Sequence, residues 1–190
     1  CTISKDGNVL DRRAGRISSE ENKKLCDLIK QKVNVPNEIE FFLETEKDHR
    51  ACMILRGSNF DDRIDETDPQ ALGVAPFAPK FQCETAIKTS SYLFSILSEI
   101  KEILKDRDRA NMILLRGYAK FREFESVHDR FGLNAVAITE YPMYRGLAKL
   151  VGMQVSTPYK NLNEVSSILN EKYKENNFFF IHFKKTDAAG

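Results

Sequence analysis

The last third of the chain carries the pattern that most restricts its fold. Three apolar runs alternate there with two patterns of helical spacing, in the order 135–138, about 142–152, 153–155, about 161–175 and 178–183. A short run that is apolar at every position is typical of a parallel strand covered on both faces. The alternation therefore predicts a doubly wound α/β segment over 132–190. We expect this segment to be too short to complete its sheet, leaving apolar surface or a free strand edge.

Residues 1–118 carry a mixed pattern. Asp6-Gly7 lies between two short β-type runs and predicts a hairpin, because glycine accepts positive φ without steric cost. Ser18, with Glu21 three residues later, predicts the start of a helix. The other elements expected here are strands at 39–43, 51–55 and 111–117 and a helix over about 84–105, whose apolar stripe is Ile87, Ser91, Phe94, Leu97 and Ile100–Ile103. An antiparallel sheet with a helix on one face suits this part.

Two polar stretches divide the chain. Residues 58–82 gather acidic side chains and three prolines, which predicts a long irregular connection. Residues 119–131 form a second, polar and aromatic connection. The predicted fold class is α/β: an α+β domain over 1–118, a linker over 119–131 and an incomplete doubly wound α/β segment over 132–190.

Charge and hydropathy exclude two classes of partner. Lys and Arg number 29 and Asp and Glu 28, so the net charge of +1 leaves no basic excess for nucleic-acid binding. No apolar run approaches the roughly 18 residues of a membrane span. The four cysteines have no zinc-type spacing and no signal peptide precedes them, which predicts reduced thiols in a cytoplasmic protein. The oligomeric state stays open.

The densest basic motif is Asp11-Arg12-Arg13-Ala14-Gly15-Arg16, which follows a predicted strand. Three guanidinium groups within five residues suit a small polyanion, because arginine donates bidentate hydrogen bonds to phosphate or carboxylate and keeps its charge. A solvated basic patch paired with neighbouring acids is the alternative, and the sequence leaves both open.

Two more arginines, Arg56 and Arg116, each end an apolar run and precede a glycine. If both runs are strands, the two guanidinium groups point to one edge of a sheet; coincidence in a leucine-rich chain is the alternative. His49 precedes a predicted strand and is a further candidate. His182, in the last apolar run, is either a hydrogen-bonded sheet histidine or a site residue.

Asp187 lies just past the last apolar run. A carboxylate at this position of a doubly wound sheet is a frequent metal or ribose ligand, and a strand-capping carboxylate is the alternative. The sequence contains no P-loop, dinucleotide-binding or hydrolase-elbow motif.

In order and spacing, these motifs resemble the archaeal-type 2,3-bisphosphoglycerate-independent phosphoglycerate mutases of the alkaline-phosphatase-like superfamily. The resemblance covers essentially the whole chain. It is carried by Asp11–Ser18, His49–Arg50, Leu55–Gly57, Thr67–Pro69, Asn111–Gly117, Tyr141–Met143, Gly146–Ala148, Gly152–Met153 and His182–Asp187. The Asp-Arg-Arg-Ala-Gly-Arg and Lys-Lys-Thr-Asp-x-Ala-Gly blocks are its most specific parts.

The resemblance implies an isomerase of glycolysis and gluconeogenesis that interconverts 3- and 2-phosphoglycerate. It implies a serine that carries the phosphoryl group and two divalent metal ions of manganese, magnesium or zinc type. Residues 1–118 then match an inserted substrate-binding domain, and 132–190 part of the phosphatase-like domain. Substrate contacts are implied for Arg12, Arg13, Arg16, His49, Arg56, Arg116 and Arg145, and a metal contact for Asp187.

The family's Asp-Gly metal strand, its nucleophile serine segment and its later Asp-His ligands are not in this sequence. We therefore expect a central fragment that is inactive by itself, holds no complete metal site and supplies substrate-holding arginines. The expected partner is phosphoglycerate, without nucleic acid or membrane. The alternatives are a non-catalytic module that binds a phosphorylated metabolite, and a phosphatase or phosphonate-processing enzyme of the same superfamily.

Overall fold

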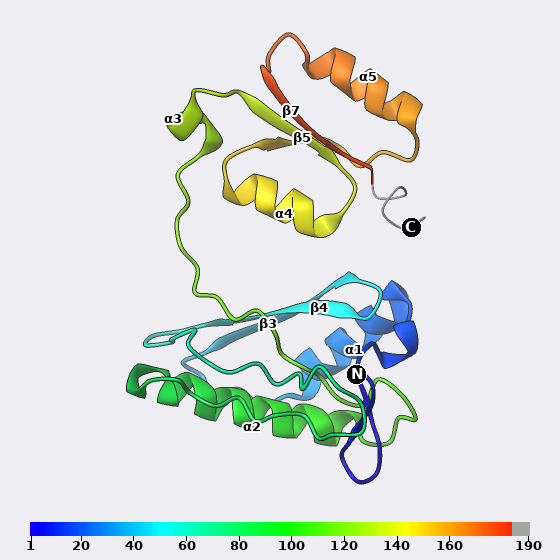
Figure 1. Ribbon diagram of the computed structural model, residues 1–190, viewed down its shortest axis with the longest axis vertical. Coiled ribbons are helices and arrows are strands. Elements are labelled where there is room, and N and C mark those ends of the chain that lie inside the picture. Colours follow the sequence, from blue (N-terminus) through cyan, green and yellow to red (C-terminus); the bar gives the residue numbers. More distant parts are fainter. Residues whose placement is uncertain (184–190) are drawn as a thin grey trace. The chain divides into compact units, whose positions relative to one another are not determined.

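The computed structural model describes residues 1–183, and the chain forms two compact units, Cys1–Lys120 and Phe121–Gly190 (Figure 1). Unit 1 contains β1 (Thr2–Ile3), β2 (Val9–Asp11), the 3-10 turn η1 (Ala14–Arg16), α1 (Ser19–Lys32), β3 (Glu40–Lys47), β4 (Arg50–Arg56), the 3-10 turn η2 (Glu84–Ala86) and α2 (Ile87–Leu104). Unit 2 contains α3 (Val127–Phe131), β5 (Ala135–Thr139), α4 (Pro142–Leu150), β6 (Gln154–Val155), α5 (Leu162–Lys172) and β7 (Phe178–His182). The α/β class is confirmed. None of the described helices is long and apolar enough to cross a membrane.

The start of unit 1 follows its local sequence signals. β1 and β2 pair antiparallel around Gly7, which adopts a φ of 84°. The Ser18 hydroxyl oxygen accepts a hydrogen bond from the Glu21 amide at 3.2 Å, so the N-cap of α1 is confirmed. Of the predicted capping box only this half is formed, because the Glu21 carboxylate pairs with Arg107 at 2.7 Å.

The core of unit 1 lies between the β3–β4 hairpin and the two long helices. Its buried side chains include Leu25 and Ile29 of α1, Leu43 of β3 and Ile100 of α2. Burying each of these aliphatic side chains contributes about 1.5–3 kcal/mol. This core fixes β3 and β4 against the helices, and thereby fixes the turn that carries His49.

The apolar stripe predicted for α2 is right in its second half, where Leu97 and Ile100 are buried, and wrong in its first half. Ile87 and Phe94, placed on the apolar stripe, are 44% and 59% exposed. The buried side chains are Thr89, Leu93, Ile96, Leu97, Ile100 and Leu104. Because the helix is apolar on more than one face, two stripes share the helical spacing, and only packing selects between them.

The strand predicted at 111–117 is not formed. Leu115 instead exchanges hydrogen bonds with Thr67, donating its amide to the hydroxyl oxygen at 2.7 Å and accepting from the Thr67 amide at 3.0 Å. Leu115 thus pairs with one residue, Thr67, and not with a neighbouring strand. Residues 111–117 therefore belong to no β ladder among the described residues. The connection over 58–82 is irregular as predicted, with one isolated bridge, between Ile64 and Phe81.

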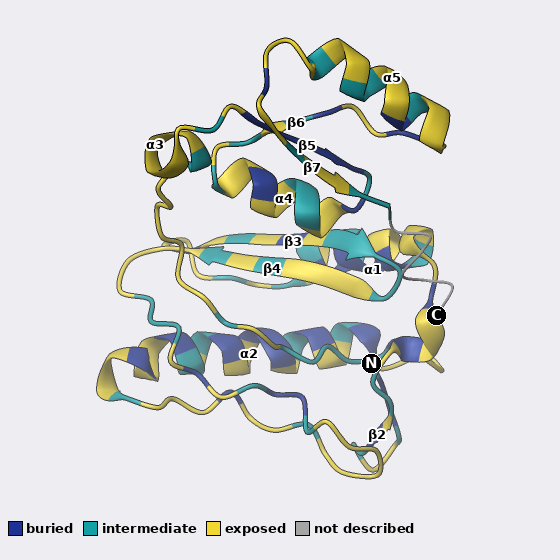
Figure 2. Ribbon diagram, turned by 45° about the horizontal axis from the view of Figure 1, so that its top comes forward, coloured by how far each residue is buried: buried dark blue, intermediate teal, exposed yellow. Residues whose placement is uncertain are grey.

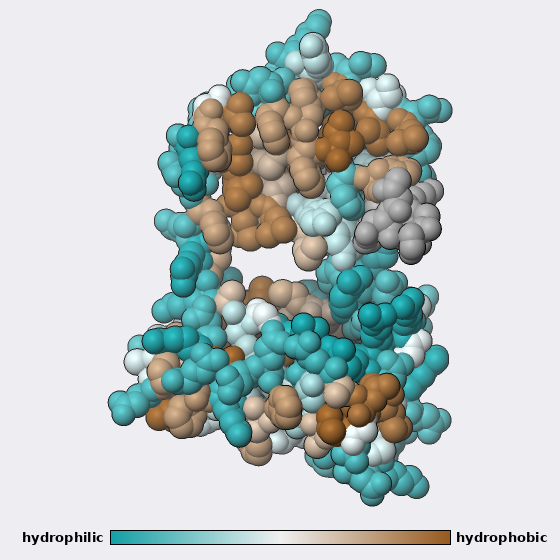
Figure 3. Space-filling view, in the orientation of Figure 1, coloured by the Kyte–Doolittle hydropathy of each residue, from teal (hydrophilic) through white to brown (hydrophobic). Residues whose placement is uncertain are grey.

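Unit 2 contains the predicted doubly wound sheet. Its strands are parallel in the order β6-β5-β7, with α4 and α5 on opposite faces (Figure 1). β5 is buried at every position, as its composition predicts (Figure 2). β7 is not the buried strand expected at 178–183, because it is a sheet edge among the described residues. Phe178, Phe180 and Ile181 are 36–47% exposed, and Figure 3 shows hydrophobic residues gathered on a face of this unit.

The predicted linker over 119–131 is partly structured. The unit boundary falls inside it, but Val127–Phe131 form α3, whose N-cap Ser126 accepts a hydrogen bond from the Asp129 amide at 3.0 Å. The Val127 amide donates to the carbonyl oxygen of Val151 at 2.9 Å. These contacts join the end of the linker to unit 2.

Candidate functional site

The basic loop after β2 is built around Asp11. One carboxylate oxygen accepts from the Arg13 amide and the other from the Gly15 amide, both at 2.7 Å. These amides hold the pKa of Asp11 below its usual range. Ala14, Gly15 and Arg16 have φ of 53°, 66° and 52°, a run that non-glycine residues rarely adopt. Asp11 therefore fixes a tight, left-handed turn.

Arg12 is held in place by a carboxylate 56 residues further along the chain. Its Nε and Nη2 donate to Oδ1 and Oδ2 of Asp68 at 2.8 and 2.6 Å. The Asp68 side chain is only 4% exposed, and the guanidinium group holds its pKa below the usual range. This bidentate, charge-assisted pair is among the stronger polar contacts available to a protein.

Arg116 joins the same carboxylate. Its Nη1 lies 3.5 Å from Oδ2 of Asp68 and its Nε lies 3.4 Å from Glu66. The structure thus brings together two of the predicted site residues, Arg12 and Arg116, at the same carboxylate. Arg116 does not end a strand. The four charges of Arg12, Arg116, Asp68 and Glu66 balance, so this group adds no net positive charge.

The net positive charge of the loop comes from Arg13 and Arg16. Both are exposed, and neither forms an ion pair with any of residues 1–183 that the structure describes. Arg109 lies beside them: a Cβ on Gly15 would be 3.6 Å from its Cδ. Arg109 lies 3.7 Å from Oε2 of Glu21, whose other oxygen, Oε1, pairs with Arg107 at 2.7 Å. In the sequence Arg109 lies among Asp106, Arg107 and Asp108, which is typical of a mixed-charge surface. The sequence therefore did not indicate that Arg109 lies beside the basic loop.

His49 lies in the turn between β3 and β4. The buried side chain of Asn22 donates to the carbonyl oxygens of Asp48 and Arg50, both at 2.8 Å, and so fixes the turn. Burial lowers the pKa of His49, and the positive charges of Arg50 and Arg13 lower it further. Its Nδ1 is buried and forms no hydrogen bond with the described residues. Arg13 of the basic loop is thus one of the charges that lower the pKa of His49.

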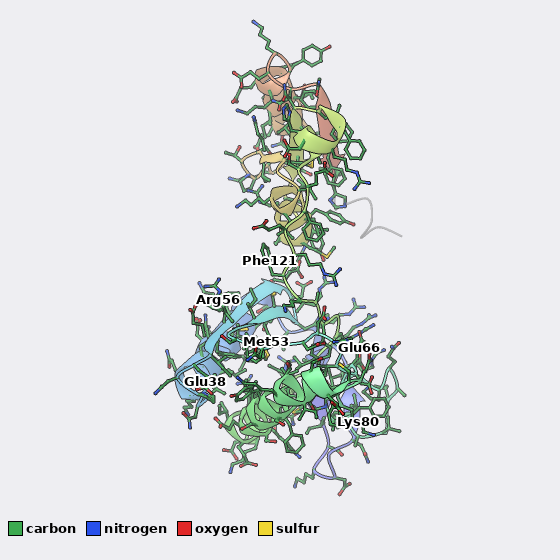
Figure 4. All side chains as sticks on the ribbon, turned by 90° about the vertical axis from the view of Figure 1, so that its left-hand side faces the viewer. Glu38, Met53, Arg56, Glu66, Lys80 and Phe121 are labelled. Atoms are coloured by element: carbon green, nitrogen blue, oxygen red, sulfur yellow. The ribbon has the colours of Figure 1, made fainter. Side chains whose placement is uncertain are left out.

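Arg56 does not join this group. It pairs with Glu40 of the neighbouring strand at 3.0 Å and its guanidinium lies 5.2 Å from the ring centre of Phe42. Figure 4 shows Arg56 well apart from Glu66, the partner of Arg116. Arg56 does end a strand, β4, but Arg116 ends none among the described residues, so of the two alternatives the shared sheet edge is wrong.

Arg145 belongs to unit 2, at the carboxyl ends of the parallel strands. Its Nη1 donates to the carbonyl oxygens of Thr139 at 3.0 Å and Ser156 at 2.8 Å. It also lines an open depression of about 470 Å³ with Glu140, Pro142, Gly146, Lys149 and Pro158. The carboxyl edge is where such sheets bind ligands, and here Arg145 connects two strand ends.

The predicted metal ligand, Asp187, lies outside the described residues. Within residues 1–183, no three His, Cys, Asp or Glu side chains gather as a metal site would require. His182 contacts the ring of Tyr144, with ring centres 4.4 Å apart, and its Nδ1 is buried without a hydrogen bond to described residues. The described part of the chain therefore does not supply a metal-binding set.

Comparison with known proteins places most of unit 1 in one family. The model of the 2,3-bisphosphoglycerate-independent phosphoglycerate mutases matches residues 1–110. The chain belongs to this family. The matched residues include the basic loop, the Asp68 carboxylate and the His49 turn.

Relatives of this mutase family match along the whole chain. A protein of Thermus thermophilus, described as a probable 2,3-bisphosphoglycerate-independent phosphoglycerate mutase, is 39% identical over 100% of this chain and 47% of its own length. A protein of Thermotoga neapolitana with the same description is 37% identical over 97% of this chain and 46% of its own. The chain thus spans about half the length of the curated relatives it matches.

A solved structure supports the fold. The cofactor-independent phosphoglycerate mutase of Thermoplasma acidophilum superposes with a TM-score of 0.71 at 22% identity. The superposition covers 96% of this chain and 53% of the other. At this identity the likeness shows the fold alone.

Proposed function

We propose that this chain is part of an enzyme that interconverts 3-phosphoglycerate and 2-phosphoglycerate, and that its basic loop binds the phosphoglycerate. Membership of the mutase family supports the reaction. The observation that carries the binding role is the pair Arg13 and Arg16, exposed on a turn that Asp11 fixes. Cytoplasmic localisation follows from the glycolytic role and belongs to the same proposal.

The chemistry of the loop suits this substrate. A phosphoglycerate carries a phosphate and a carboxylate, and arginine binds both through paired N–H donors. Arg13 and Arg16 form no ion pair with the described residues, whereas Arg12 and Arg116 are paired with Asp68 and Glu66. Burial and nearby positive charges lower the pKa of His49 and so favour its neutral ring, which has one donor and one acceptor nitrogen.

The remaining predicted residues act in the complete enzyme under this proposal. Arg56 and Arg145 contact substrate there, and Asp187 contributes one ligand to a pair of divalent metal ions. Such ions would stabilise the charge on a phosphoryl group as it passes through a phosphoserine. Because residues 1–183 gather no metal-binding set, we propose that the serine and most metal ligands come from other parts of the full-length enzyme, and that this chain alone is inactive.

Two assays test this function. With 3-phosphoglycerate and Mn²⁺, the 190-residue chain should form no 2-phosphoglycerate above a blank, whereas the full-length protein that contains it should form it. Turnover by the chain alone contradicts its inactivity. Release of inorganic phosphate without isomerisation by the full-length protein favours a phosphatase, and binding without any turnover favours a non-catalytic module.

A further inference from the structure

The pair Thr67-Asp68 joins three segments that are distant in the sequence. Thr67 exchanges hydrogen bonds with Leu115, and its carbonyl oxygen accepts from the Phe77 amide at 2.9 Å. Asp68 binds Arg12 of the basic loop and approaches Arg116. The basic loop and the 112–117 segment are therefore connected through two adjacent side chains of the irregular connection.

The carboxylate of Asp68 has no room for a ligand of its own. Its oxygens accept from Nε and Nη2 of Arg12 and from the Gln70 amide at 2.9 Å, and Arg116 lies 3.5 Å away. A buried carboxylate is costly unless such donors compensate it. Since its donors come from the protein, Asp68 acts on the arginines rather than on a substrate.

The bidentate contact also limits how Arg12 can move. Two of its five N–H donors, one on Nε and one on Nη2, are engaged by Asp68, and this fixes the plane and direction of the guanidinium group. Arg12 directly precedes Arg13, the residue whose amide is bound by Asp11. A shift of Arg12 therefore displaces the start of the turn that presents Arg13 and Arg16.

We propose that Asp68 is a positioning residue: by holding Arg12 and Arg116 it fixes the basic loop in the geometry that binds the phosphorylated ligand. This inference rests on the proposed function for the ligand and on the contacts above for the positioning. It separates two roles among the arginines, with Arg12 and Arg116 as the support and Arg13 and Arg16 as the anion-binding groups.

The first test needs no ligand. Asp68→Asn keeps the shape of the side chain but removes its charge, and amide hydrogen exchange of Arg13 and Gly15 reports on the loop. We expect exchange to become at least about tenfold faster, which corresponds to the loss of a charge-assisted hydrogen bond. The matched control is Asp61→Asn, which breaks a similar bidentate pair with Arg63, at 2.9 and 2.6 Å, without touching the loop.

A second variant covers the case in which Asp68→Asn does not fold. Arg12→Lys keeps the charge but replaces the fork by a single ammonium group, so the pair is weakened and not abolished. We expect exchange at Arg13 and Gly15 to become faster than in the wild type, but by less than in Asp68→Asn. Unchanged exchange in a folded Asp68→Asn or Arg12→Lys chain overturns the positioning role, as does an equal increase in Asp61→Asn.

The second test measures affinity for inorganic phosphate and for 3-phosphoglycerate by titration. Asp68→Asn should weaken both by at least about tenfold while Asp61→Asn leaves them unchanged. If the wild-type chain binds neither anion, the proposed function fails and the exchange data still decide whether Asp68 fixes the loop. If the wild type binds and Asp68→Asn binds equally well, the positioning role fails and the proposed function stands.

Discussion

Arg145 donates a hydrogen bond of 3.0 Å to the carbonyl oxygen of Thr139, the last residue of the central strand β5. The same Nη1 also donates to Ser156, directly after β6. Thr139 and Ser156 are both buried, at 0% and 5% exposed. This arginine of α4 therefore holds together the carboxyl ends of two neighbouring parallel strands.

Replacing Arg145 tests that role. Arg145→Ala leaves two buried carbonyl groups without this donor, so we expect the free energy of unfolding of unit 2 to fall by about 1–3 kcal/mol. Urea unfolding with a probe in unit 2 measures the change. Lys149→Ala, an exposed position of the same helix, is the control and should change little. An Arg145→Ala chain as stable as the control would show that the two carbonyls do not depend on this side chain.

His49 predicts a pH dependence of stability. Burial, and then the charges of Arg50 and Arg13, lower its pKa below the ordinary value of 6.5. As the pH falls through about 6.5, the unfolded chain gains a proton on this ring while the folded chain stays neutral until a lower pH. The unfolded state then binds more protons, so this group lowers the free energy of unfolding as the pH falls.

The comparison of wild type with His49→Gln isolates this effect. Between about pH 7.5 and pH 5.5 the wild-type chain should lose more stability than the variant, because glutamine does not titrate. Urea unfolding at both pH values provides the measurement, and other titrating groups cancel in the difference. Parallel pH profiles for the two chains would mean that the pKa of His49 is the same in the folded and unfolded states.

The exposed edge strand β7 predicts self-association of this chain. Phe178 and Ile181 are 41% and 47% exposed on a strand that has one partner, β5, among the described residues. Apolar edge strands pair readily with other chains, and a charge on the edge prevents this. Ile181→Lys should therefore shift sedimentation at high concentration toward the monomer. Leu162→Lys, at an equally apolar exposed position on α5, should leave the association unchanged; an equal effect of both would argue for nonspecific attraction.

The parts of the fold that depend on neighbouring residues were predictable from the sequence. The Asp6-Gly7 hairpin, the Ser18 cap and the alternation that gives the β6-β5-β7 sheet all follow from signals within a few residues. The α2 register and the 111–117 segment were not predictable in this way, because each depends on partners more than 30 residues away, on β3 and at Thr67.

In the candidate site, too, local sequence predicted some features, whereas others depend on distant contacts. The Arg-Arg-Ala-Gly-Arg motif identified the basic loop, but sequence alone could not separate Arg12, engaged by a buried carboxylate, from the exposed Arg13. Asp68 lies in a family motif, yet its role as the shared partner of Arg12 and Arg116 depends on contacts across 56 and 48 residues. Chain geometry, and not residue type, decides which arginine is available to an anion.

The central claim is that Arg13 and Arg16 bind the phosphate group of a phosphoglycerate. The most direct measurement is an amide NMR titration of the chain with 3-phosphoglycerate, repeated for the Arg13→Ala, Arg16→Ala double variant and for Arg122→Ala, an exposed arginine of unit 2. We predict saturable shifts at Arg13, Gly15 and Arg16, a dissociation constant raised at least about tenfold in the double variant, and no change in the control. Shifts that are absent, or an affinity equal in all three chains, would contradict the claim.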